Sequence, residues 1–276
     1  MQQDSFSDQE FAAFQRFLED ACGIVLGQNK RYLVVSRLSR LSEKYGISSL
    51  SELIDRVDKK RDRVLREHII EAMTTNETFW FRDVHPYEEL KARILPDFAA
   101  RKISQPRFWS AACSYGQEPY SISMILREYL ASKPGSFTDA KILATDISPS
   151  VLKDAREGRY DAMALARGLS DERRKKFFTD DGDYCRIKPD IAKRIQFQQT
   201  NLLQSYSLLG RFDAIFCRNV LIYFSAESKT DILNRMAACL NPGGYLLLGA
   251  SESISQYSDA YEMIRSGGGV LYQVKK

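Results

Sequence analysis

The spacing of hydrophobic residues divides the chain into a helical part and a part in which strands and helices alternate. Apolar side chains recur at helical spacing from residue 7 to about residue 73, which predicts a bundle of four helices, the third capped by Ser49. Another helix is expected over residues 86–101, bent at Pro96. From Phe108 onward short apolar runs alternate with helical segments, a pattern typical of a parallel sheet covered by helices.

The alternating part also predicts the order of its elements. Strands are expected at residues 108–112, 141–146, 194–198, 212–217 and 245–249, and a helix at residues 226–240. Residues 261–265 and 270–274 flank three glycines and predict an antiparallel hairpin at the sheet edge. The stretch at about residues 160–193 is too long for a simple connection and predicts a small inserted subdomain.

The expected fold class is therefore α/β, a Rossmann-like sheet with a small inserted β subdomain, preceded by an all-α helical bundle. The expected domains are residues 1–75, a linker over residues 76–105, and residues 106–276.

The first strand of the sheet leads into a turn that predicts a nucleoside site. The side chains become smaller toward the end of the strand, residues 113–116 form the turn, a helix begins at Glu118, and the next strand ends at Asp146. In βαβ nucleotide-binding units an acid at that strand end accepts hydrogen bonds from ribose. Only Gly116 of a dinucleotide fingerprint is present, and Glu118 would repel a pyrophosphate and attract a cationic nucleoside such as S-adenosylmethionine. Alternatively, Glu118 only favours the helix N-terminus electrostatically.

Composition narrows the class of protein. The chain is 44% hydrophobic and 28% charged, as in ordinary globular proteins, with no apolar run long enough to span a membrane and no signal peptide. A cytoplasmic protein that is not an integral membrane protein is expected. Five scattered cysteines and two histidines predict neither disulfides nor a metal site. Residues 30–66 hold 11 basic and 5 acidic residues, so the positive charge gathers near the N-terminus.

Five segments resemble, in order, motifs of the CheR-type chemoreceptor glutamate O-methyltransferases, over essentially the whole chain. They are Thr74–Arg82 (TTNETFWFR), Ser110–Ser121 (SAACSYGQEPYS), Thr145–Ile147 (TDI), Asn201–Leu203 (NLL) and Phe212–Phe224 (FDAIFCRNVLIYF). Gln117 stands where many relatives have glutamate, and Trp80 replaces a phenylalanine. Neither change is expected to abolish binding of the methyl donor.

The resemblance implies a methyltransferase that uses S-adenosylmethionine, yields S-adenosylhomocysteine and methylates glutamates of chemotaxis receptors. It places donor binding at Asn76, Thr78, Arg82, Glu118, Asp146, Asn201, Leu202, Arg218 and Asn219. Asp146 suits the ribose, Glu118 the ammonium, and Asn201 an adenine edge.

Arg82, Arg218 and Tyr223 are assigned to the catalytic step. Arg82 also suits the carboxylate of the donor. A glutamate acceptor is already ionised at neutral pH, so these residues are expected to place donor and acceptor, and no general base is required. Alternatively, Arg218 and Asn219 only end a strand, and Tyr223 only packs in the core.

A basic helix is the expected docking surface for the receptor. At residues 30–45, Arg37, Arg40 and Lys44 share one side, next to an apolar stripe that anchors the helix. This side would meet acidic receptor helices and recruit the enzyme to membrane receptor arrays, unless it is only a solvated face. A regulatory protein could also dock on this domain. The loop at residues 179–184 is short and has three aspartates, so no tethering of a receptor tail peptide is expected.

Two competing classes remain at this stage. The basic domain would also suit a nucleic-acid methyltransferase, but Cys217–Val220 lacks the N/D-P-P-Y/F motif that holds a flipped base, so no nucleic-acid substrate is expected. A donor-binding signalling adaptor without turnover would be favoured by a degraded donor site, whereas the site motifs are intact.

Overall fold

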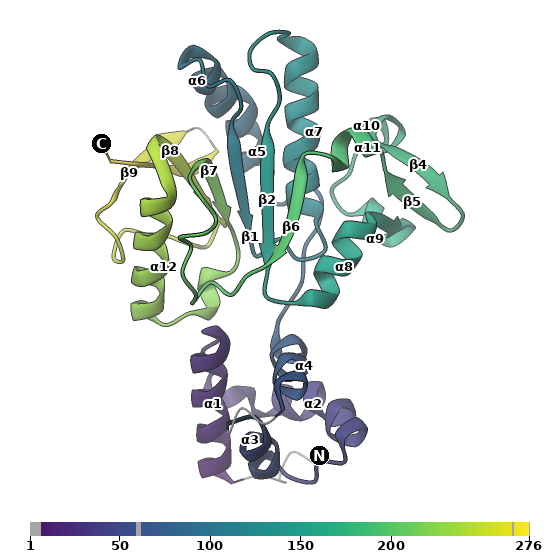
Figure 1. Cartoon of the computed structure of the whole chain (residues 1–276), viewed down its shortest axis with the longest axis vertical. Helices are drawn as coiled ribbons and strands as arrows, with labels where there is room; N and C mark the ends of the chain where they lie inside the picture. The colour runs from purple at the N-terminus through teal and green to yellow at the C-terminus, as the bar shows by residue number, and fades with distance from the viewer. Residues whose placement is uncertain (1–6, 59–61, 267, 276) are drawn as a thin grey trace.

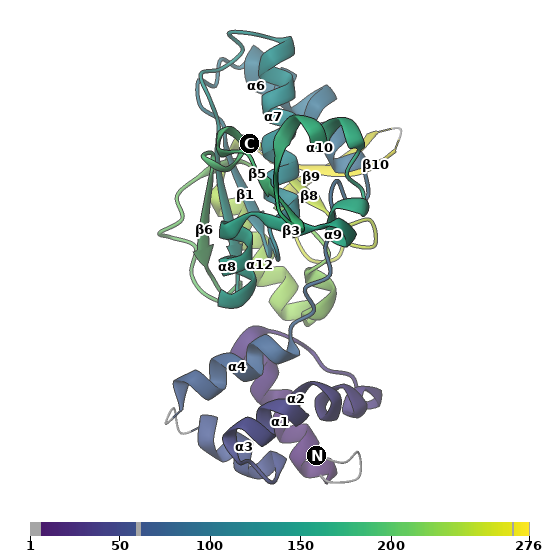
Figure 2. The same ribbon diagram turned by 90° about the vertical axis from the view of Figure 1, so that its right-hand side faces the viewer.

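The computed structural model describes residues 7–58, 62–266 and 268–275. It has two parts, a helical domain that carries the N-terminus and an α/β domain that carries the C-terminus. The chain passes from one to the other through a linker after α4, Arg63–Met73 (Figure 1). The view from the side shows the same separation (Figure 2). The predicted fold class is confirmed. No helix in the described ranges is both long and apolar enough to cross a membrane.

The N-terminal domain packs its helices around one apolar core. Its elements are α1 (Asp8–Cys22), the 3-10 turn η1 (Gln28–Lys30), α2 (Arg31–Tyr45), α3 (Leu50–Asp58) and α4 (Arg63–Met73). Ser7 and Glu10 form a capping box at the start of α1, and the Ser49 hydroxyl accepts from the Glu52 N–H in α3 as the sequence predicted. Phe11, Phe14 and the other buried side chains of these helices form the core.

The linker region differs from the predicted single helix. It contains α5 (His85–Glu89), a π-helical turn η2 (Leu90–Ile94) and α6 (Leu95–Ala100). The Leu95 N–H donates to the Leu90 carbonyl, five residues back, so the irregularity precedes Pro96. Pro96 itself lies in the first turn of α6, where its missing N–H leaves no gap in the helix.

The α/β domain is built on a twisted sheet with the order β6-β2-β1-β7-β8-β10-β9. The strands are β1 (Arg107–Ala111), β2 (Lys141–Asp146), β6 (Ile195–Gln199), β7 (Phe212–Cys217), β8 (Leu240–Leu248), β9 (Tyr261–Ser266) and β10 (Gly269–Val274). The first five are parallel, and β10 is antiparallel to both neighbours, which confirms the terminal hairpin. The β8 strand starts at Leu240 rather than near Tyr245, with an irregular register in between.

Helices cover both faces of this sheet. They are α7 (Gln117–Ser132), α8 (Pro149–Glu157) and α12 (Ala226–Cys239), with a 3-10 turn η3 (Leu221–Tyr223) after β7. Alternate residues of β1 point to opposite faces, so Phe108 joins the core under α7 and Trp109 the core under α12.

The predicted insert is a small antiparallel sheet with its own helices. Its elements are β3 (Arg159–Asp161), α9 (Ala162–Ala166), α10 (Asp171–Phe177), β4 (Phe178–Asp181), β5 (Tyr184–Ile187) and α11 (Pro189–Ala192), in the sheet order β3-β5-β4. Arg159 and Arg186 both pair with Asp181, so one of the three loop aspartates has its charge offset. This weakens the charge argument against binding of a receptor tail.

Candidate functional site

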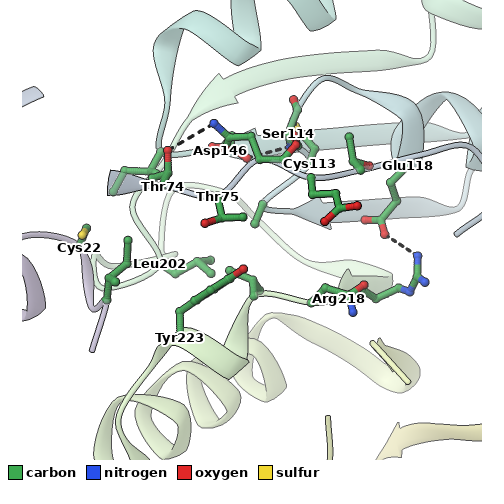
Figure 3. A pocket seen from close by; sticks show the side chains of 18 of the residues that line it. Cys22, Thr74, Thr75, Cys113, Ser114, Glu118, Asp146, Leu202, Arg218 and Tyr223 are labelled. Atoms are coloured by element: carbon green, nitrogen blue, oxygen red, sulfur yellow. Dashed lines mark hydrogen bonds and ion pairs between the residues drawn. The ribbon is translucent and has the colours of Figure 1, made fainter. Parts of the chain in front are cut away.

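A pocket lies between the two domains, where the parallel strands end. Its volume is about 1000 Å³ when the space that opens to solvent is included. Ten residues predicted from the sequence line it together: Asn76, Thr78, Arg82, Glu118, Asp146, Asn201, Leu202, Arg218, Asn219 and Tyr223. Figure 3 shows side chains from both domains around it, with Cys22 of the N-terminal domain on one side and Glu118 and Arg218 joined on the other.

The turn from β1 into α7 brings backbone to the pocket. Ala112, Ser114 and Gly116 all have positive φ, and such a run turns the chain sharply at the strand end. A Cβ on Gly116 would lie 3.1–3.2 Å from Ala155 and two tyrosine side chains, so glycine fits both the φ and the space. The Ser114 hydroxyl donates to the Asn76 carbonyl, which ties this turn to the linker.

Asp146 lies at the end of β2, where an acid was expected. One carboxylate oxygen accepts from the Ser114 N–H at 2.8 Å and the other from the Ser148 N–H at 3.0 Å. Burial raises the pKa of this carboxyl, and the backbone hydrogen bonds oppose the shift. Each oxygen keeps acceptor capacity, so Asp146 is fixed in place and still able to bind two ribose hydroxyls.

Glu118 is buried at the opposite end of the pocket. It accepts from the Ser110 hydroxyl at 2.7 Å and from the Arg218 guanidinium at 3.0 Å. Burial raises the pKa of Glu118, while Arg218, Ser110 and the more distant Arg82 act to lower it. The charge of Glu118 is thus balanced by Arg218. Its attraction for a donor ammonium is therefore weaker than that of an unpaired carboxylate.

Arg218 has a different position from the one expected of a residue that touches substrate. Its side chain is only 2% exposed, and its two terminal nitrogens donate to Glu118, Asp83, the Arg82 carbonyl and the Tyr87 hydroxyl. These contacts use its terminal N–H groups, and its Nε is buried without a partner among the described residues. In this structure Arg218 therefore holds the residues around it, and its predicted contact with donor or acceptor stays a prediction.

The linker turn that Arg218 holds is strained. Phe81, Asp83 and Val84 have positive φ, and for the β-branched Val84 this conformation is a clear outlier. The Arg82 side chain extends from this turn into the pocket wall, where it donates to the Glu77 carbonyl and lies 5.4 Å from the Phe79 ring centre. Its remaining N–H groups leave Arg82 able to bind a carboxylate.

The Asn201 side chain contacts both domains. Its side-chain amide donates to the Ala21 carbonyl at the end of α1, and its oxygen accepts from the Leu203 N–H. The side chain thus joins the two domains, and one N–H and one oxygen lone pair remain for the predicted contact with adenine. Leu202 beside it is nearly buried and contributes an apolar wall. The Thr200 hydroxyl also lies in the pocket lining, with no partner within the described chain.

The N-terminal domain forms part of the pocket, which sequence reasoning missed. Cys22, Ile24 and Met73 line it, and the Val25 N–H donates to the Tyr223 carbonyl at 2.8 Å. Two further contacts join the domains beside the pocket. Glu71 accepts from the Ser148 hydroxyl and the Ser150 N–H, and Ile147 packs against the core of the helical domain.

Arg37 belongs to this junction and not to a free basic face. Its guanidinium donates to the Met73 and Thr74 carbonyls and to the Thr75 hydroxyl, in the chain segment that enters the pocket. Arg40 and Lys44 remain exposed on α2. The docking surface predicted from the sequence therefore loses Arg37.

Asn219 and Tyr223 follow β7 at the pocket wall. Asn219 has positive φ, and the Tyr223 hydroxyl has no hydrogen-bond partner within the described residues. Like Arg82, both are polar side chains of the pocket with capacity left to bind a ligand.

Comparisons with known proteins agree with this architecture. A family model described as the CheR methyltransferase SAM binding domain matches residues 76–269, and one described as the CheR methyltransferase all-alpha domain matches residues 9–74. The chemotaxis protein methyltransferase of Vibrio parahaemolyticus is 53% identical over 98% of each chain. Chemotaxis protein methyltransferase 1 of Pseudomonas aeruginosa is 50% identical over 98% of this chain and all of its own, and the chemotaxis protein methyltransferase of Escherichia coli is 33% identical over 99% and 93%.

Proposed function

The chain belongs to the CheR methyltransferase family, and from this premise we propose that it methylates glutamate side chains of chemotaxis receptors, forming methyl esters. The methyl donor is S-adenosylmethionine, which supplies an electrophilic methyl group on a sulfonium. Asp146 would hold its ribose, the turn at Ala112–Ser114 would lie along it, and Glu118 would hold its ammonium group. The protein would act in the cytoplasm at receptor arrays.

The proposal of a carboxylate acceptor rests on which polar side chains of the pocket are still able to bind a ligand. Both pocket carboxylates that are buried, Asp146 and Glu118, already accept two hydrogen bonds each. Burial raises the pKa of the Cys22 thiol to about 11 and that of Cys113 well above its ordinary value, and no histidine is among the described lining residues. Arg82, Asn219 and Tyr223 are among the polar side chains that keep hydrogen-bond capacity, and such groups bind a carboxylate rather than remove a proton.

This arrangement suits methyl transfer to an ionised acid. A glutamate has a pKa near 4.3 and needs no deprotonation at neutral pH. Positioning of the two reactants with water excluded can account for about 7–11 kcal/mol of the barrier. Arg82 should hold the acceptor only moderately, because its charge is lost in the transition state and a firm ion pair would stabilise the ground state.

The test is transfer of labelled methyl groups. The protein is incubated with labelled donor and, separately, receptor-bearing membranes, DNA or buffer alone. We expect label on the membranes that mild base releases as methanol, as a carboxyl ester requires. Label that resists base, label on DNA, or no transfer by a protein that binds the donor would each contradict the proposal.

Reversal of the exposed basic residues on α2 should slow receptor methylation. The double variant Arg40→Glu and Lys44→Glu removes the positive charge that would steer acidic receptor helices, and its effect should be largest at low salt. Donor affinity should stay unchanged, since neither residue lines the pocket. The matched control reverses Lys133 and Lys141, which are exposed on the α/β domain. Equal rates for the two double variants would rule out this docking surface.

We also propose that methylation proceeds without tethering of a receptor tail. The β4–β5 turn at Gly182 is tight, β4 is one of two edge strands of this sheet, and the loop aspartates Asp180 and Asp183 have no ion pair among the described residues, so they would repel a peptide carboxylate there. Receptors with and without their C-terminal tail peptides should therefore be methylated at similar rates. Micromolar binding of a tail peptide, together with a large rate loss on truncation, would overturn this prediction.

A further inference from the structure

Glu252 organises the pocket wall from outside the pocket. It lies in the turn after β8, and its carboxylate accepts hydrogen bonds from four backbone N–H groups of two loops. One oxygen accepts from Asn219 at 2.7 Å and Gly249 at 2.8 Å. The other accepts from Val220 at 3.0 Å and Ile222 at 3.3 Å. The carboxylate thus joins the carboxyl ends of the neighbouring strands β7 and β8.

The segment that it holds would be unfavourable without such a partner. Asn219 has a φ of +56°, and the N–H groups of Asn219, Val220 and Ile222 converge on one point. Converging N–H groups repel one another unless an anion accepts from them, and hydrogen bonds to a carboxylate are about twice as strong as neutral ones. Glu252 supplies that anion.

The space around Gly249 is matched to the same contact. A Cβ on Gly249 would lie 2.6 Å from the side-chain Nδ2 of Asn219 and 2.8 Å from a carboxylate oxygen of Glu252. Glycine therefore allows the two loops to approach closely enough for one side chain to bridge them.

We propose that Glu252 is a positioning residue for methyl transfer: its carboxylate fixes the Asn219–Tyr223 segment so that Asn219 and the free Tyr223 hydroxyl face the reactants. This inference rests on the proposed function. Glu252 does not line the pocket, whereas Asn219, Val220 and Tyr223 do. The Tyr223 carbonyl is held in turn by the Val25 N–H of the helical domain, so the segment is fixed from two sides.

The variant that tests the proposal is Glu252→Gln, which keeps the shape but turns an NH₂ toward the converging N–H groups. We expect kcat for receptor methylation to fall about 100-fold, as a small misplacement of positioning groups can cause. Donor affinity measured by titration calorimetry should change less than about tenfold, because Asp146, Glu118 and the linker remain in place. Ser251→Ala in the same turn and Glu262→Gln on β9 are matched controls, both on exposed residues, and should behave as wild type.

A readout independent of activity separates this inference from the proposed function. Amide hydrogen exchange of Asn219, Val220 and Ile222 should be about tenfold faster or more in Glu252→Gln, with the strand β1 unchanged. If wild type transfers no methyl group, the proposed function fails while the exchange result still tests Glu252. Unchanged exchange, unchanged kcat, or a fall in kcat fully explained by the unfolded fraction would each overturn the positioning role.

Discussion

Replacing Arg218 with methionine is expected to lower the free energy of unfolding by about 3–5 kcal/mol, because the change leaves a buried carboxylate without its counter-charge. Arg218 is 2% exposed and pairs with Glu118, whose side chain is 12% exposed, so water cannot compensate easily. The same change releases the strained turn at Arg82 and Asp83. Urea unfolding measures the stability loss, and calorimetric titration should show donor binding severely weakened.

Two controls make the Arg218 result specific. Arg63→Met removes an exposed arginine whose pair with Glu67 spans 3.4 Å, and such pairs are worth about 0.2–1 kcal/mol. Adding Glu118→Gln to Arg218→Met removes the unpaired charge and should restore part of the stability. If Arg218→Met costs no more than Arg63→Met, Arg218 does not hold this network.

The fold was predictable because the spacing of apolar residues within each segment indicates whether that segment forms a helix or a strand. The change from helical spacing in residues 7–73 to short apolar runs after Phe108 reports which faces are buried, and burial decides the layers. The site positions were predictable for a related reason. Asp146 and Glu118 lie at a strand end and a helix start, where parallel sheets bind ligands.

The partners of those side chains were not predictable from the sequence. Asn201 meets Ala21, and Arg218 meets both Glu118 and the Arg82 turn, across long separations in the chain. Periodicity tells which side of an element is buried but not which residue lies opposite. Arg37 shows the consequence, since its helical position resembled that of Arg40 while its guanidinium binds the linker.

The Glu252 contact left a faint signal in the sequence. An acid shortly after a strand end, three residues beyond Gly249, is compatible with a carboxylate that accepts from backbone N–H groups. The signal could not show that the bound loop belongs to a different strand. That information comes from the parallel pairing of β7 with β8.

The helical bundle is the proposed receptor-docking domain, and it also contacts the segments that form the pocket. Glu71, Arg37 and Val25 bind segments that lead directly into the pocket, so we expect the position of the bundle to affect donor binding. By linkage, a receptor or regulatory protein that shifts the bundle would change donor affinity, and donor would change the affinity of that partner by the same factor.

Replacing Asp146 with alanine is expected to weaken donor binding by about 1.5–3 kcal/mol, or roughly 10- to 150-fold in Kd, because a charged hydrogen-bond acceptor for ribose is lost. Asp146 is 5% exposed and fixed by Ser114 and Ser148, so little reorganisation can replace it. Titration calorimetry measures the change, and Asp154→Ala, an exposed aspartate on α8, is the control.

The same carboxylate predicts how binding depends on pH. Burial raises the pKa of Asp146 above its ordinary value of 3.8 and that of Glu118 above 4.5. As pH falls through these raised values, each group gains a proton and loses its charge, so donor affinity should decrease at a higher pH than ordinary carboxyls would cause. In Asp146→Ala the acid-side loss should be smaller, since one of the two titrating groups is gone. An affinity that is unchanged in the folded variant, with the same pH dependence, would remove Asp146 from the donor site.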